Sequence, residues 1–175
     1  MGFSISWVGF RAIETPAVLR QLDLHITAPA EMDDAPLLFA EMPSGWSIIF
    51  ANDVEWASPD RMASLSVGRE IIGVIVEEHT DIWAVFGYRD NHLQWTVVRQ
   101  DGMATPPGLQ VSGTIPDVAK PCLTPEWQAK LQPFDRQREP LDVAQAVTGF
   151  IHDRPLSWGI PAFRRLESGI GQPLL

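Results

Sequence analysis

The chain has 175 residues, which fits one folded domain with a core large enough to be stable without disulfides or a structural metal. Hydrophobic residues make up 45% of the sequence and charged residues 20%, a balance that excludes an intrinsically disordered protein. The formal net charge of −9 excludes nucleic acid and anionic membrane as expected partners, because both carry negative charge.

Three further features predict a cytoplasmic protein. No stretch of the sequence reaches the ~18 apolar residues that a membrane-spanning helix needs. The N-terminus lacks the basic region followed by an apolar region that marks a secretory signal. The single cysteine, Cys122, excludes an internal disulfide and suits a reducing compartment.

The first 69 residues are interpreted as strands alternating with short helices. Residues 3–10 form the first predicted strand, and Thr15-Pro16 has the residue types that begin a helix. Residues 28–43 are rich in proline and acidic residues, which predicts a surface loop with a short strand at 37–40. A strand follows at 46–50, and Ser58-Pro59 begins a second short helix.

Residues 70–99 predict a meander of three antiparallel strands, at 70–78, 82–89 and 92–99. The first of these strands is almost continuously apolar, as expected of a central strand that is covered on both faces. The third alternates apolar and polar residues, which is typical of a strand with one buried face. Asp90-Asn91 separates the second strand from the third, and both residue types tolerate the positive φ of a two-residue hairpin turn.

The C-terminal third predicts helices after Thr124-Pro125 and at 141–150, followed by an irregular tail at about 155–175. Taken together, the elements predict a single α+β domain over residues 1–175. Its sheet is expected to be mainly antiparallel and built on the meander at about 70–99. The short helices are expected after the first strand, before the meander and in the C-terminal third.

Acidic residues are concentrated in the first half of the chain, where residues 14–81 contain thirteen of them and three arginines. We expect several to form one rim beside the sheet, with Phe39 and Trp56 as apolar anchors and the carboxylates steering a basic protein partner. The alternative is a solvated surface that keeps the protein soluble. The predicted partner-binding residues are Glu31, Asp33, Asp34, Glu41, Asp53, Glu55, Trp56 and Asp60.

A second group of polar residues lies where the first meander strand ends, and it consists of Glu77, Glu78, His79 and Asp81. An imidazole beside carboxylates can bind a metal or relay a proton. Adjacent strand residues point to opposite faces, however, which favours a solvated strand end. Neither the four histidines nor Cys122 show metal-ligand spacing, and no nucleophile or phosphate-binding motif is present. We therefore expect no catalytic residue and no cofactor.

Four short segments together resemble a family of small, uncharacterised bacterial proteins of acidic α+β type. The segments are Trp7 with the leucine-bearing helix after it, Gly45-Trp46, Glu77-Glu78-His79 and Gly149-Phe150-Ile151-His152-Asp153. Some acidic proteins of this kind act as immunity factors against secreted or contact-delivered toxins. The resemblance implies such a role here and implies no catalytic residue.

Three functions remain open. The first is a non-catalytic acidic binding protein, such as a bacterial immunity protein that blocks a basic toxin, for example a nuclease, by covering its active site. The second is a small hydrolase or metal-dependent enzyme that uses Glu77, Glu78 and His79. The third is an accessory or scaffold protein that self-associates through an exposed sheet edge.

Overall fold

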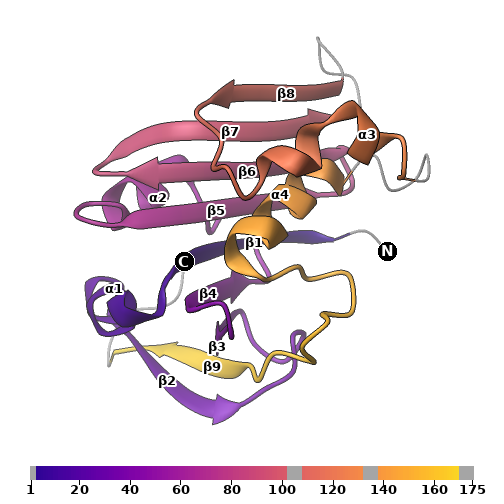
Figure 1. The fold of residues 1–175 in the computed structure, drawn as a ribbon. Coiled ribbons are helices and arrows are strands. Elements are labelled where there is room, and N and C mark those ends of the chain that lie inside the picture. The colour runs from indigo at the N-terminus through magenta and orange to yellow at the C-terminus, as the bar shows by residue number, and fades with distance from the viewer. Residues whose placement is uncertain (1–2, 102–107, 132–137, 170–175) are drawn as a thin grey trace.

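The computed structural model describes residues 3–101, 108–131 and 138–169, which form one large antiparallel sheet flanked by short helices (Figure 1). The predicted α+β class with a mainly antiparallel sheet is confirmed. The strands are β1 (Ser4–Arg11), β2 (Leu24–Pro29), β3 (Leu37–Glu41), β4 (Trp46–Ala51), β5 (Glu70–Glu77), β6 (Ile82–Arg89), β7 (His92–Gln100), β8 (Gly108–Gly113) and β9 (Arg164–Ser168). The helices are α1 (Thr15–Gln21), α2 (Pro59–Leu65), α3 (Pro125–Gln128) and α4 (Glu139–Thr148), with 3-10 turns η1 (Ala12–Glu14) and η2 (Lys120–Leu123).

The strand order across the sheet is β2-β9-β3-β4-β1-β5-β6-β7-β8. At its centre, β1 pairs with β5 from Ser4 opposite Glu77 to Phe10 opposite Ile71, and both strands are largely buried. A strand that is covered on both faces must be apolar on both, which explains the run of isoleucine and valine in β5.

Two hydrophobic layers cover the sheet. On one side, called here the α4 face, α4 and η2 pack over residues such as Trp7 and Val74. On the other side, called the α2 face, α1 and α2 pack over Val8 and Phe10. Figure 1 shows α4 and α2 on opposite sides of the strands. Within the described ranges, no helix combines the length and the apolar character needed to cross a membrane.

Local sequence explains where several elements begin and end. The Ser58 hydroxyl accepts a hydrogen bond from the Arg61 backbone N–H at 3.4 Å and begins α2. Gly149, with φ of 81°, ends α4 in the left-handed conformation that glycine adopts without strain. Asp90 and Asn91 have φ values of 50° and 66°, which suit the two-residue turn between β6 and β7.

The C-terminal segment corrects the expectation of an irregular tail from about residue 155. Residues 164–168 form β9, which lies between β2 and β3 in the sheet. β2 was also not predicted as a strand. β9 has only one buried residue, Leu166, among charged and polar neighbours, so its sequence carries no alternation. β2 does alternate apolar and polar residues, but over a segment of only six residues. They become strands because they pair with each other across about 140 residues of chain.

Candidate functional site

Carboxylates gather at one end of the sheet, where five neighbouring strands begin or end. The register defines this end, since Ala51 at the end of β4 pairs with both Leu37 of β3 and Ser6 of β1. On the other side of β1, Ser4 pairs with Glu77 at the end of β5, and β6 begins beside Glu77. Four strand spacings from β3 to β6 make this end about 20 Å wide. We call it the acidic end, and its acidic residues are Glu31, Asp33, Asp34, Asp53, Glu55, Glu77, Glu78 and Asp81.

Asn52 joins the two loops that carry most of the exposed carboxylates. Its side-chain amide donates hydrogen bonds to the carbonyl oxygens of Met32 and Ala35, both at 2.8 Å. Within the first loop, the Asp34 carboxylate accepts the backbone N–H of Glu31 at 2.9 Å. The side chains of Asp33, Asp34 and Asn52 line a shallow, open hollow of about 370 Å³. Residues 31–34 are therefore fixed beside the end of β4.

The loop after β4 is anchored to β1 by Ser6. The buried Ser6 hydroxyl donates to the carbonyl oxygen of Asp53 at 2.7 Å and accepts the N–H of Ala57 at 3.0 Å. The Asp53 carboxylate accepts the N–H of Glu55 at 2.9 Å, a local turn that aspartate commonly forms. Asp53 and Glu55 thus point outward from a segment whose backbone is held from within.

The two ends of the sheet differ in how their carboxylates are neutralised. In the described part of the chain, no carboxylate of the acidic end forms a salt bridge. At the opposite end, Arg11 pairs with Glu70 at 3.6 Å and Arg69 pairs with Glu14 at 3.8 Å. In the described ranges, Glu41 and Asp90 at the opposite end also form no salt bridge, so the two ends differ in degree: the acidic end has more carboxylates and none of them is paired with a basic side chain.

Trp56 and Phe39 are not the exposed anchors that we expected. Trp56 is only 8% exposed and belongs to the core of the α2 face, and Phe39 is fully buried in the same layer. The Arg61 guanidinium lies over the Trp56 ring, 4.9 Å from its centroid, and donates to the Trp56 carbonyl. Burial lowers the pKa of Arg61, and the nearby Asp53 carboxylate opposes that shift. Trp56 therefore stabilises the fold beneath the acidic end.

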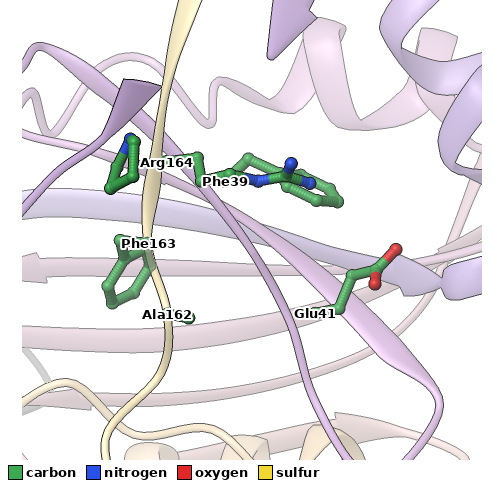
Figure 2. A pocket seen from close by; sticks show the side chains of 6 residues that line it. Phe39, Glu41, Ala162, Phe163 and Arg164 are labelled. Atoms are coloured by element: carbon green, nitrogen blue, oxygen red, sulfur yellow. The ribbon is translucent and has the colours of Figure 1, made fainter. Parts of the chain in front are cut away.

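Glu41 and Asp60 lie away from the acidic end. Glu41 pairs with Ser47 at the far end of β3 and lines a hollow of about 370 Å³ between β3 and β9, with Phe39, Phe163 and Arg164 (Figure 2). Figure 2 shows the Phe39 and Arg164 side chains pointing away from Phe163. Asp60 is in the first turn of α2. Burial of the Tyr88 side chain raises the pKa of Tyr88, and the Asp60 carboxylate raises it further. Of the eight predicted partner-binding residues, Glu31, Asp33, Asp34, Asp53 and Glu55 carry the exposed carboxylates that lie at the acidic end.

An exposed aromatic side chain that we did not predict lies at the acidic end. Phe3 precedes β1 and is 43% exposed. Its backbone N–H donates to the Glu78 carboxylate at 3.0 Å, and its ring meets the His152 ring edge to face. The predicted first strand, at residues 3–10, included Phe3. In the structure the strand begins one residue later, at Ser4, and Phe3 lies just before it.

Glu77, Glu78, His79 and Asp81 do not converge on one point. Glu77 accepts the Ser4 hydroxyl at 2.7 Å and the His79 backbone N–H at 3.2 Å. Glu78 follows on the opposite face and contacts Phe3. Within the described ranges, no group of three or more histidine, cysteine, aspartate or glutamate side chains could hold a metal ion. These residues instead extend the acidic end from β4 across β1 to β6.

Behind Phe3, a buried ionic cluster fixes α4 and the segment after it to the sheet. Three acidic side chains are almost fully buried within it, and each is paired with an arginine. The pairs are Glu139–Arg99 at 3.2 Å, Asp153–Arg138 at 2.7 Å and Asp142–Arg154 at 2.5 Å. These carboxylates are structural, since burial of an ion pair leaves neither charge available to a partner.

Two potentially reactive side chains also lie in this region. His152 is largely buried, and burial lowers its pKa to about 4, with Asp153 and Glu78 opposing the shift and the nearby arginines adding to it. The Cys122 thiol donates to the Asp142 carbonyl at 3.6 Å, and burial followed by the Asp142 charge raises its pKa. A raised thiol pKa disfavours the reactive thiolate, so Cys122 lacks the environment of a nucleophile.

Comparison of the chain with protein-family models, curated protein sequences and solved structures gave no match.

Proposed function

We propose that this protein is a non-catalytic binding protein that captures a basic protein partner on its acidic end. The observation that carries the proposal is the clustering of eight carboxylates, none of them in a salt bridge among the described residues, across the ends of β3, β4, β5 and β6. Uncompensated charges of one sign cost folding stability through mutual repulsion. Their concentration in one region is therefore typical of a surface that meets the opposite charge.

The shape of the acidic end favours a protein over a metal ion or a small molecule. Its carboxylates are spread over about 20 Å, which matches the width of a protein–protein contact rather than of an ion site. Phe3 adds an exposed aromatic group among them. Aromatic anchors supply much of the affinity of protein interfaces, while surrounding charges mainly raise the rate of association.

The inferred mechanism is steric and electrostatic blockade. Carboxylates would orient a basic partner during encounter, and Phe3 would then be desolvated against it. A toxin that acts on nucleic acid, such as a nuclease, needs a basic cleft for its substrate, so an acidic surface of this width is suited to cover it. An immunity protein against such a toxin is the biological role that we propose, in agreement with the resemblance described above.

The direct test is capture of partners from a lysate of the source cell by the immobilised protein, followed by mass spectrometry. We expect the wild-type chain to retain a basic protein that high salt releases. A variant with Asp33→Asn, Asp34→Asn, Asp53→Asn and Glu55→Gln should lose it. The two amide replacements at Asp34 and Asp53 can still accept the local N–H bonds, so the loops are preserved.

The matched control neutralises four exposed or peripheral carboxylates elsewhere, by Glu41→Gln, Asp60→Asn, Asp90→Asn and Glu126→Gln. It changes the net charge by the same amount but leaves the acidic end intact. Retention of the same basic protein by both variants, or its loss from both, would show that position on the molecule does not matter and would reject the proposal.

A further inference from the structure

The two edge strands of the sheet differ in how they are protected against pairing with another chain. At one edge, β2 contains Pro29, its pairing with β9 is irregular between Ile26 and Pro29, and His25 lies near the Glu167 carboxylate. Proline, bulges and charges are the usual devices that prevent edge-to-edge association. The β2 edge is therefore unsuited to extend the sheet.

At the other edge, β8 has none of these devices. Its sequence, Gly-Leu-Gln-Val-Ser-Gly, contains no charged residue and no proline, and it pairs regularly with β7 from Gly108 to Gly113. In the described ranges, β7 is its only strand neighbour. In a protein of net charge −9, an uncharged edge strand adds no like charges of its own to a contact between two copies.

Val111 lies at the middle of this edge. It pairs with the fully buried Val97, so it points to the α4 face, yet it remains 48% exposed. If a second copy aligns its β8 antiparallel about a two-fold axis perpendicular to the sheet, the face of every side chain is preserved. Val111 then lies opposite Val111 of the second copy, and Gln110 lies opposite Ser112. Opposed β-branched side chains stabilise a strand pair.

The direction of β8 also separates the acidic ends. Gly108 pairs with Gln100, and Gln100 pairs with Ile82, so β8 begins at the acidic end and runs away from it. An antiparallel pair of β8 strands therefore places the two acidic ends at opposite ends of the joined sheet. A parallel pair would bring them to the same end, where their charges would repel.

We propose that two copies of this chain associate through antiparallel pairing of their β8 strands, which makes one continuous sheet. This inference goes beyond the proposed function, because it leaves both acidic ends accessible. A strand pair of this length without a further interface is small, so the dimer is expected to be weak and to dissociate on dilution.

The test is sedimentation velocity of the full chain at increasing concentration. We expect the weight-average mass to rise from that of one chain towards that of two. Val111→Lys should weaken the association at least about 10-fold, because two lysines would then face each other across the axis. Ser112→Lys, on the other face of the same strand, should also weaken it and serves if Val111→Lys fails to fold.

The matched control is Val118→Lys, which adds the same charge at a valine that is 60% exposed and lies after β8. It should leave the dimer unchanged. A wild-type chain that remains single at every concentration would overturn the proposal, as would equal weakening by Val118→Lys. A mass that continues to rise beyond two copies would also overturn it, because a two-fold pair of single edges is closed.

Discussion

The rings of Phe3 and His152 meet edge to face, with centroids 5.3 Å apart and planes inclined at 84°. One residue precedes the first strand and the other follows the last helix, so this contact joins two distant parts of the chain at the acidic end. It also helps to bury the histidine beside Glu78 and Asp153. Phe3 therefore belongs both to the proposed binding surface and to the contacts that bury His152. The stability of the fold and the binding of a partner can each be measured at this site.

The buried His152 predicts a pH dependence of stability. Its pKa of about 4 in the folded protein lies below the ordinary value of 6.5, so the unfolded chain takes up a proton first as the pH falls. The histidine therefore destabilises the fold as pH falls from 6.5 to about 4, and has little effect above 6.5. We expect the free energy of unfolding to fall by about 2 kcal/mol between pH 7 and pH 5 through this residue.

Urea denaturation at a series of pH values provides the measurement. His152→Gln should flatten the profile over this range, whereas His92→Gln, which changes an exposed histidine of β7, should leave it as in the wild type. Identical profiles for the wild type and His152→Gln would contradict a buried neutral histidine.

Phe3 and the carboxylates should affect different rate constants of partner binding. Phe3→Ala should mainly raise the dissociation rate, because it removes a desolvated contact. Asp33→Lys should slow association, by about 10-fold at low ionic strength, and should reduce its dependence on salt. Surface plasmon resonance with the captured partner at several salt concentrations separates the two effects. An unchanged association rate for Asp33→Lys would remove the acidic loop from the interface.

Gly87 is required because Trp95 lies against it. A Cβ atom at residue 87 would be 2.1 Å from the indole Nε1 of Trp95, and the Trp95 side chain is buried in the core. We expect Gly87→Ala to destabilise the fold by about 1–3 kcal/mol through overpacking. Gly73→Ala should cost less, although its Cβ would lie 1.7 Å from the Met62 sulfur, because the flexible methionine can move. Chemical denaturation measures the loss of stability in each variant. A larger loss for Gly73→Ala than for Gly87→Ala would refute this explanation.

The buried ion pair between Asp142 and Arg154 should matter far more than the exposed pair between Asp117 and Lys120. Asp142→Ala leaves the Arg154 guanidinium without its closest carboxylate, although Asp153 remains 3.6 Å away, and we expect a loss of about 1–3 kcal/mol. Asp117→Ala, at a fully exposed site, should leave the thermal midpoint unchanged.

A double variant tests whether the uncompensated charge is the cause of that loss. Asp142→Leu combined with Arg154→Met removes both charges and should cost less than Asp142→Ala alone. A double variant that is less stable than the single one would show that the cluster contributes through packing instead.

Local sequence patterns predicted much of the fold but only part of the site. Apolar runs and alternation identified the strands of the sheet centre, and Asp90-Asn91 identified its tight turn, because these signals depend on neighbouring residues alone. The exposed acidic loop at 31–34 could be predicted from its charge and proline content. The burial of Trp56 could not, since an isolated indole in a loop has no local signal for what covers it.

By itself, the sequence determined the α+β class, the antiparallel character of the sheet and the acidity of the first half. Only the tertiary structure decided that Glu77, Glu78 and Asp81 lie at the same end as Asp33 and Asp53, that Glu41 does not, and that residues 164–168 complete the sheet. The physical reason is that strand order and register are set by pairing between segments far apart in the chain. Antiparallel pairing then decides which strand ends, and which charges, lie together.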